Sequence, residues 1–287
     1  MGIEQIEIFS KINVGKNLKY IFMAKVAILI CSCDFYSECW EPIIFSFKKY
    51  WPDCEYDKLI VSNNKDVKIS GAKIIKVGDH KGWASDTLKA VGMTDYDYYI
   101  YFQEDYWLNQ RVDNDAIKAH IQHCIDNHID YLKLGPDRPS CDKYRIGNSD
   151  YCKNPMDHRY AICTVVSIWS RELFKKVCIP GHTGWDFEYK IVPYINENHI
   201  EFNSEALHTS VIPTKSILLI RGNAIQRGKW TPPGVKFLKE NGFEDILKQR
   251  NIQNKFYSFI FYKMPERYGL VYPKLAILRL LRILNIN

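Results

Sequence analysis

The chain has 287 residues, with 39 Lys and Arg residues against 33 Asp and Glu residues, which gives a formal net charge of +6. Apolar residues make up 46% and charged residues 25% of the sequence, a composition that is typical of a soluble globular protein and that excludes collagen-like, disordered and small disulfide-stapled classes. Because a charge of +6 over 287 residues is diffuse and no nucleic-acid-binding motif accompanies it, we expect no nucleic-acid partner.

Residues 1–24 precede the first predicted strand and are expected to form an N-terminal extension. The run from Val26 to Ile30 is continuous and rich in β-branched residues, which is typical of a strand buried on both faces of a parallel sheet. It ends in polar residues, as do the next two predicted strands. This order predicts an α/β fold with a doubly wound sheet, whose ligand-binding loops lie at the carboxyl ends of the strands.

Further along the chain, strands and helices continue to alternate. The predicted strands are residues 26–30, 58–62, 72–77, 98–102, 131–134 and 164–169. The predicted helices are residues 39–51, 85–91, 172–177 and a helix that begins at Asp113 or Asn114 and places Ile117, Ile121, Cys124 and Ile125 on one apolar face. The polar stretch 136–158 is predicted to be a long surface loop, of the kind that is often functional.

The C-terminal region has a different character. Residues 246–287 are expected to form a helical extension, in which Lys274, Arg279 and Arg282 fall among apolar residues. A basic amphipathic helix at 274–287 either lies in a membrane interface, held by anionic lipid, or packs on the domain. The sequence leaves both alternatives open.

Nine cysteines are scattered without a C-x-x-C pair or zinc-ribbon spacing, which argues against a disulfide framework or a structural zinc site. We therefore expect a reducing compartment and a cytoplasmic location. Attachment to the inner face of a membrane through residues 274–287 is the accompanying expectation.

The strongest chemical signal is the adjacent carboxylate pair Glu104 and Asp105, directly after the predicted strand at 98–102. Hard cations such as Mg²⁺ and Mn²⁺ prefer oxygen ligands and usually share them with substrate phosphates. An acidic pair at the end of a buried strand is therefore a candidate site for a metal ion, a ribose or a diphosphate. The other interpretation is an ordinary polar strand end.

These residues stand in a segment, 25–242, that resembles glycosyltransferases of the GT-A fold, especially the family-2-like bacterial and viral enzymes. The resemblance implies a Rossmann-like mixed sheet in a domain spanning residues 25–245, with a nucleotide-binding loop at Ser32, Cys33 and Asp34. Gln103-Glu104-Asp105 takes the place of the D-x-D motif, which grips the ribose and the metal-bound diphosphate. Because Gln103 replaces the first aspartate, the motif is incomplete, and the expected Mn²⁺ or Mg²⁺ would be held by Asp105, Glu104 and a late histidine, His208.

The resemblance also implies an acceptor loop at residues 180–188. Inverting transfer needs a carboxylate that accepts the proton of the acceptor hydroxyl, on the face opposite the leaving group. Asp186 matches that position best and Glu188 is second, while Trp185 would stack on a sugar face. Asp186 can equally serve as a helix cap, a role that does not exclude catalysis.

Two more segments are expected at the donor site. Residues 78–86 join a strand to a helix and offer Lys81, Trp83 and Asp86, and the helix amino terminus favours anions. Arg227 and Lys229 lie in a basic, glycine-containing segment that could neutralise the departing diphosphate. Each segment also has a plain structural interpretation, as a connection or a solvated loop.

The sequence thus predicts transfer of a sugar from a nucleoside diphosphate donor, with uracil the favoured base, to a glycan or lipid-linked acceptor. Two alternatives stay open. A sugar nucleotidyltransferase would use a similar site, although its glycine-rich phosphate loop is missing after the first strand. A non-catalytic carbohydrate-binding protein could use the 19 tyrosines and 7 tryptophans as a stacking surface.

Overall fold

A computed structural model describes residues 24–134, 141–208 and 223–254. Its centre is an eight-stranded mixed sheet with the strand order β3-β2-β1-β4-β7-β5-β8-β6. Neighbouring strands are parallel except that β7 and β6 run antiparallel to their neighbours. The strands are β1 (Val26–Cys31), β2 (Asp57–Ser62), β3 (Lys73–Lys76), β4 (Tyr98–Gln103), β5 (Tyr131–Lys133), β6 (Tyr151–Lys153), β7 (Ser167–Ser170) and β8 (Ser204–Leu207). A separate hairpin pairs β9 (Ile225–Gln226) with β10 (Lys229–Trp230).

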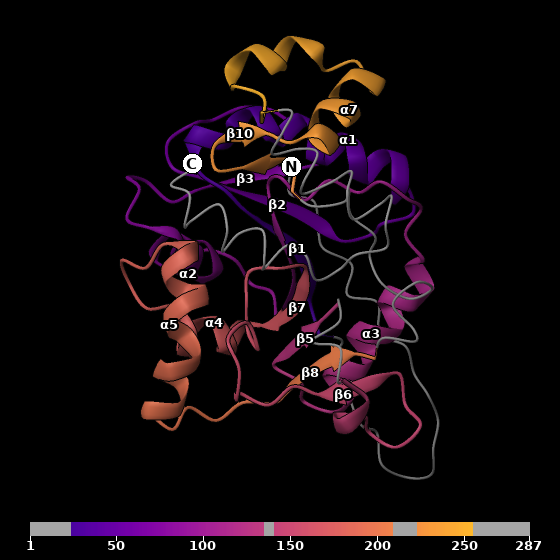
Figure 1. Cartoon of the computed structure of the whole chain (residues 1–287), viewed down its shortest axis with the longest axis vertical. Coiled ribbons are helices and arrows are strands. Elements are labelled where there is room, and N and C mark those ends of the chain that lie inside the picture. Colours follow the sequence, from indigo (N-terminus) through magenta and orange to yellow (C-terminus); the bar gives the residue numbers. More distant parts are fainter. Residues whose placement is uncertain (1–23, 135–140, 209–222, 255–287) are drawn as a thin grey trace, which may run out of the picture.

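Helices cover both faces of the sheet (Figure 1). One face is covered by α1 (Trp40–Tyr50), α3 (Asn114–Asp126) and α7 (Pro232–Glu240), and the other by α2 (Trp83–Gly92), α4 (Arg171–Val177) and α5 (Gly184–Glu197). The short 3-10 helices are η1 (Asp34–Cys39), η2 (Cys141–Tyr144) and η3 (Glu244–Gln249). Within the described ranges no helix has the length and apolarity that a membrane span requires.

The central strands have two apolar faces because their residues alternate between two cores. In β1, Ile28 and Ile30 pack under α1 and α3, while Ala27 and Leu29 pack under α2 and α4. This alternation is the pattern of a strand buried on both sides. Each helix then contributes one stripe, such as Trp40, Ile43, Ile44 and Phe47 of α1.

The sheet has a topological switch point between β1 and β4. From β1 the chain moves outward to β2 and β3, and then returns to place β4 on the other side of β1, with Cys31 paired to Gln103 at the carboxyl ends. In open α/β sheets, ligands bind in the crevice outside the carboxyl ends at such a point. The loops that follow β1 and β4 are therefore the first place to look for a site.

The fold confirms the predicted mixed α/β sheet flanked by helices, and the strands predicted for the first half of the chain are present. The predicted loop at 136–158 is wrong in part, because it contains η2 and β6, which completes the sheet edge beside β8. The N-terminal extension at 1–24 lies outside the described residues apart from Ala24, and of the C-terminal extension at 246–287 only residues 246–254, which include the end of η3, are described. Cys152 is disulfide-bonded, which the expected reducing compartment does not favour, whereas seven other cysteines of the described residues are free.

Candidate active site

The acidic pair lies at the carboxyl end of β4 and is buried. Glu104 and Asp105 retain only 9% and 5% of their exposure. Asp105 is held by the segment that enters the β9–β10 hairpin: its carbonyl accepts from Ala224 N at 2.9 Å, and its Oδ2 accepts from Ile225 N at 3.3 Å. The pair therefore faces the hairpin and η1 at the switch point.

Burial changes the protonation of this pair. It raises the pKa of Asp105 to about 7, although the hydrogen bond from Ile225 N acts to lower that pKa. Burial, followed by the negative charge of Asp105, raises the pKa of Glu104 well above its ordinary value. Two carboxyl groups side by side in a poorly solvated place cannot both ionise easily. At neutral pH the pair therefore carries less than two negative charges and can donate a hydrogen bond.

Arg250, immediately after η3, supplies a buried positive charge beside the pair. Its guanidinium is ion-paired with Glu38, and both side chains are only 5% exposed. It also donates from Nη2 to the Phe35 carbonyl at 2.7 Å and lies 4.6 Å and 4.4 Å from the ring centroids of Phe35 and Tyr36. Its charge acts to lower the pKa of both Glu104 and Asp105. Nothing in the sequence around residue 250 signals this role, because its partners lie more than 200 positions earlier.

The predicted phosphate-binding cations stand on the β9–β10 hairpin. Arg227 and Gly228 form its two-residue turn with φ of 51° and 72°, and positive φ at both positions is the hallmark of a type I′ turn. Arg227 and Lys229 are exposed. Two extended residues span roughly 7 Å, so the hairpin brings Arg227 close to the backbone group that binds Asp105.

The loop after β1 is committed to internal contacts. Ser62 Oγ and the backbone N–H groups of residues 63–65 donate four hydrogen bonds of 2.7–3.0 Å to the Asp34 carboxylate. A carboxylate has about four acceptor positions, so Asp34 has little capacity left for a nucleotide base. Ser32 Oγ accepts from the Trp40 indole at 2.7 Å, and burial raises the pKa of the Cys33 thiol. The structure thus shows Asp34 tying the β1 and β2 loops together.

Asp86 is a buried carboxylate at the first turn of α2. Its Oδ2 accepts from Asn63 Nδ2 at 3.1 Å and lies 2.5 Å from His80 Nδ1, and its Oδ1 accepts from Lys81 N at 3.1 Å. These contacts join the ends of β2 and β3 to α2. The side chain of Lys81 is exposed at the same rim, as a donor-site role requires.

The amino terminus of α5 abuts the carboxyl end of β4. A Cβ added at Gly184 would lie 4.0 Å from Gln103 Nε2 and 3.9 Å from Trp83 Cγ. Trp83 donates from its indole to the Tyr101 hydroxyl at 2.9 Å and packs on Phe187 at 4.8 Å. Gln103 is therefore the residue of the acidic motif that faces α5, whereas Asp105 faces the hairpin. The predicted acceptor loop and donor strand are neighbours.

Asp186 is engaged within its own helix. Its Oδ2 completes a capping box with Thr183, and its Oδ1 lies 2.8 Å from Lys190 Nζ. Hydrogen bonds from the Lys190 ammonium, which has the larger effect, and from Thr183 hold the pKa of Asp186 well below its usual range. A carboxylate stabilised in this way accepts a proton poorly.

Glu188 has different surroundings. Its Oε1 accepts from Thr164 Oγ1 at 2.6 Å and from Thr164 N at 3.3 Å, which fixes the carboxylate. Burial raises the pKa of the Tyr106 phenol most, and the negative charges of Asp105 and Glu188 raise it further. Tyr106 is 8% exposed, and it is close enough to both the acidic pair and Glu188 for their charges to act on its phenol.

A metal site of the predicted composition does not assemble. His208 follows β8, which is separated from β4 by β7 and β5, and three strand spacings amount to about 14 Å. Among residues 24–134, 141–208 and 223–254, no group of three or more His, Cys, Asp or Glu side chains is placed to hold a metal ion. Because Asp105 is also bound to Ile225 N, these residues do not fit the expected ion, and we assign it no step.

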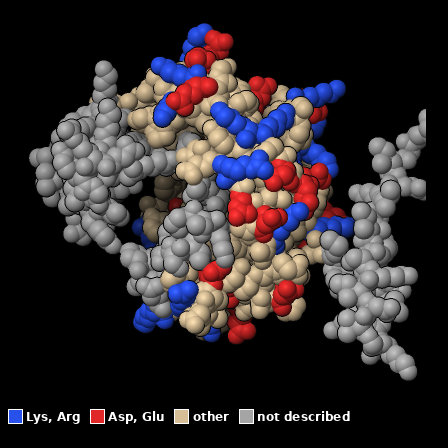
Figure 2. Space-filling view, turned by 90° about the vertical axis from the view of Figure 1, so that its right-hand side faces the viewer, with Lys and Arg blue, Asp and Glu red and all other residues tan. Residues whose placement is uncertain are grey.

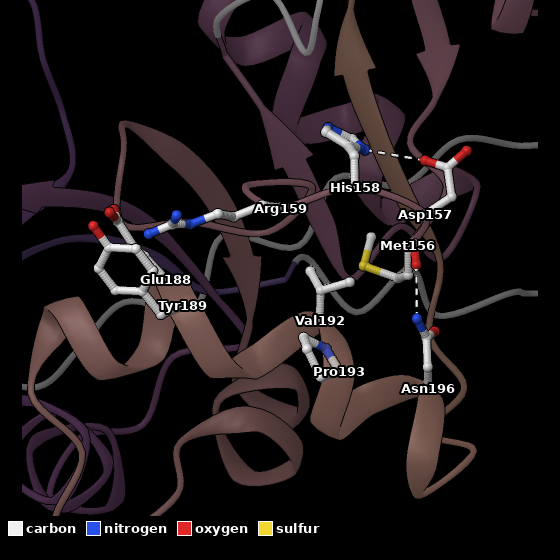
Figure 3. A pocket seen from close by; sticks show the side chains of 9 residues that line it. All are labelled: Met156, Asp157, His158, Arg159, Glu188, Tyr189, Val192, Pro193 and Asn196. Carbon is white, nitrogen blue, oxygen red and sulfur yellow. Dashed lines mark hydrogen bonds and ion pairs between the residues drawn. The ribbon is translucent and has the colours of Figure 1, made fainter. Parts of the chain in front are cut away.

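A pocket of about 240 Å³ opens between residues 156–159 and α5, next to Glu188 (Figure 3). Tyr189 forms one wall, and Val192 and Pro193 lie at its base. Trp185, predicted to stack on a sugar, is 67% exposed, and its ring plane is inclined by 28° to that of Tyr189, with ring centroids 6.4 Å apart. Sequence reasoning missed Tyr189 and Arg159, although Tyr189 follows Trp185 by one helical turn.

Comparisons with known proteins give only distant similarities. No family model matches the chain, and no curated protein matches it. Among solved structures, S. aureus TarS in complex with UDP-GlcNAc has a TM-score of 0.43 and 13% identity over 64% of this chain and 56% of that chain. A cytidylyltransferase from Leptospira borgpetersenii has a TM-score of 0.44 and 14% identity, over 81% and 100%. A mannosyl-3-phosphoglycerate synthase from Rubrobacter xylanophilus has a TM-score of 0.37 and 15% identity, over 61% and 62%.

This chain spans little more than half of the length of that TarS chain. Identities of this size, with TM-scores below 0.5, do not assign an activity.

Proposed function

We propose that the chain transfers a sugar from a nucleoside diphosphate donor to an acceptor hydroxyl, with inversion and with Glu188 as the base. The observation that supports this most directly is the arrangement of charge at the switch point. The buried pair Glu104 and Asp105 follows β4, and the fixed carboxylate of Glu188 stands on α5, whose amino terminus abuts the end of that strand. The solved structures that this chain distantly resembles include TarS in complex with UDP-GlcNAc and with UDP, which supports a nucleotide-sugar donor.

In this proposal the acceptor oxygen attacks the anomeric carbon while its proton passes to Glu188. The bond between that carbon and the diphosphate oxygen breaks, and its electron pair leaves with the nucleoside diphosphate. Arg227 and Lys229 on the hairpin stabilise the departing charge. A proton that burial retains on the Glu104–Asp105 pair can be donated in a hydrogen bond to a phosphate oxygen, as a neutral carboxylic acid does in a poorly solvated site.

Thermal unfolding of the full chain with UDP, GDP, CDP, dTDP and the matching monophosphates tests the donor site. Binding to the folded state alone stabilises it by about 2.7 kcal/mol at a ligand concentration 100 times the dissociation constant. We expect one diphosphate to raise the melting temperature more than its monophosphate does. If no diphosphate produces a shift, the proposal fails.

The reaction products identify the chemistry. A glycosyltransferase releases a nucleoside diphosphate from a nucleotide sugar, with transfer to an acceptor or slow transfer to water. A nucleotidyltransferase instead releases inorganic pyrophosphate from a nucleoside triphosphate and a sugar phosphate. A non-catalytic carbohydrate-binding protein releases neither. Only the first outcome agrees with the proposal.

A further inference from the structure

Arg159 is an exposed residue that lines the α5 pocket, and its side chain stacks on two tyrosine rings. Its guanidinium carbon lies 3.2 Å from the ring centroid of Tyr189 and 4.8 Å from that of Tyr160. Figure 3 shows the side chain extending to the Tyr189 ring beside Glu188. Stacking on an aromatic face sets the plane of the guanidinium and leaves its N–H groups directed outward from the edge.

The charge of Arg159 has no acidic partner among residues 24–134, 141–208 and 223–254. Within the described part of the chain it makes no hydrogen bond or ion pair, whereas its neighbours do: His158 lies 3.1 Å from Asp157, and Lys190 lies 2.8 Å from Asp186. Arg250 provides a comparison inside the same molecule. It too lies on two aromatic rings, but its N–H groups meet the Glu38 carboxylate. Arg159 likewise stacks on two rings, but it is exposed, and its N–H groups meet no carboxylate of the described residues.

The surroundings of Arg159 suit a carbohydrate. The exposed rings of Trp185 and Tyr189 follow one another along α5, and the pocket combines the apolar base of Val192 and Pro193 with polar groups. An aromatic surface beside a directed charged group is a common design of small-molecule sites. Glu188, the proposed base, lines the same pocket. A molecule that occupies this pocket therefore lies within reach of the base.

We propose that the acceptor is an anionic carbohydrate whose carboxylate or phosphate group binds the N–H groups of Arg159 while its ring packs on the exposed Trp185 nearby. This inference rests on the proposed function, because it assigns the pocket to the acceptor. A planar guanidinium matches the two oxygens of a carboxylate or phosphate bidentately. Arg159 is then a residue that determines acceptor specificity.

Binding of three sugars that share one ring tests this assignment. Ligand-observed NMR titrations of the full chain would use glucose, glucuronic acid and glucose 6-phosphate in the presence of the nucleoside diphosphate. We expect at least one anionic sugar to bind about tenfold more tightly than glucose, since a charge-assisted bidentate contact contributes a preference of this order. Preference for glucuronic acid alone indicates a uronic acid, and preference for the phosphate alone indicates a phosphorylated sugar.

Variants connect the preference to the residue. Arg159→Gln should abolish it, and Arg159→Lys should retain part of it because the charge remains but the fork is lost. Arg111→Gln is the matched control, since Arg111 is an exposed arginine paired with Asp53 at 3.0 Å away from the pocket. It should leave the preference unchanged.

Two results would overturn the inference. The first is equal binding of all three sugars to the unmodified chain, which includes the case that none of them binds detectably. The second is an anion preference that survives in Arg159→Gln. The nucleotide melting shift is a separate readout, and Arg159→Gln should leave it intact. Loss of that shift in the unmodified chain counts against the proposed function, whereas equal sugar binding with an intact shift counts against the Arg159 site alone.

Discussion

Two carboxylates of α5 differ in their surroundings although only Phe187 separates them. Asp186 is bound to Thr183 and Lys190, while Glu188 is oriented by Thr164 and lines the pocket. We therefore expect Glu188→Gln to lower the transfer rate by about 10²–10⁴-fold, the usual contribution of a general base. Asp186→Asn should lower the rate less than about tenfold. Steady-state kinetics of both variants, with nucleotide melting shifts as a check on donor binding, make the comparison; the opposite ranking would return the base to Asp186.

The buried carboxyl of Asp105 makes stability depend on pH. Its pKa in the folded chain is about 7, above its ordinary value near 3.8, so its contribution to stability is fully present below about pH 4 and is lost as the pH rises through 7. Asp105→Asn should remove this term, which amounts to a few kcal/mol, and flatten the decline in the free energy of unfolding between pH 4 and 7.

Urea unfolding at several pH values measures that slope. Asp126→Asn is the control, because Asp126 is exposed and its side chain accepts a hydrogen bond from Gln122 in the same helix. It should leave the slope unchanged. Identical slopes for Asp105→Asn and the unmodified chain would show that Asp105 ionises normally.

At this scale the sequence predicted which residues cluster better than it predicted what each one does. Glu104 and Asp105 were found from their place after a buried strand, and Arg227 and Lys229 from their charge and the adjacent Gly228. The role of Asp34 could not be predicted, because its four donors come from the last residue of β2 and the loop that follows it. Arg159 lies in a loop whose partner, Tyr189, is on a separate helix, so no local pattern joins them.

Among the elements, α7 depends on a close contact with the hairpin that holds Asp105. A Cβ at Gly234 would lie 2.5 Å from the Ala224 carbonyl oxygen and 2.9 Å from its Cα, which are backbone atoms that cannot move aside easily. Gly234→Ala should therefore lower the free energy of unfolding by about 1–3 kcal/mol, the usual cost of overpacking.

Gly92→Ala at the end of α2 is the matched control for this contact, because a Cβ there meets nothing within 4 Å. It should be neutral or stabilise the chain by about 0.5–1 kcal/mol, since alanine restricts the unfolded chain more than glycine does. Denaturant unfolding compares the two variants. Equal effects would mean that α7 can shift away from the hairpin without cost.

Elements with several turns or strong alternation were predictable, and short ones were not. The run in β1 and the stripe of α1 contain enough residues to reveal their period. In contrast, β9 and β10 have two residues each, too few for any period, and the Arg227-Gly228 turn departs from the usual Asn-Gly signal. The edge strand β6 was hidden because its three residues stand in a polar, turn-rich stretch.

Across the whole molecule, contacts between distant parts of the chain build the site. Lys and Arg side chains are interspersed with Asp and Glu side chains on the face shown in Figure 2, and exposed pairs such as Lys118 with Glu55 are spread over the surface. The buried charges behave differently, since residues 38, 104, 105 and 250 meet at one place. Only the folded sheet brings them together, which is why the sequence could not predict the ion pair of Arg250.

The ion pair between Glu38 and Arg250 joins the end of the described chain to the loop at the switch point. Because both side chains are buried, removing one partner leaves an uncompensated charge. Arg250→Met should lower the free energy of unfolding by about 3–5 kcal/mol, while Glu38→Leu combined with Arg250→Met should restore much of the loss. The corresponding pair of changes at Lys118 and Glu55, which are 43% and 59% exposed, should cost less than about 1 kcal/mol.

A double-mutant cycle from urea unfolding gives the interaction energy of the buried pair, expected at about 2 kcal/mol or more. The same variants report on the acidic pair, because Arg250 acts to lower the pKa of Glu104 and Asp105. Without it, the carboxyl groups should ionise at higher pH, and the decline in stability between pH 4 and 7 should extend above pH 7. Additive single effects together with an unchanged pH profile would show that Arg250 is electrostatically separate from the site, and that η1 and η3 are joined by packing alone.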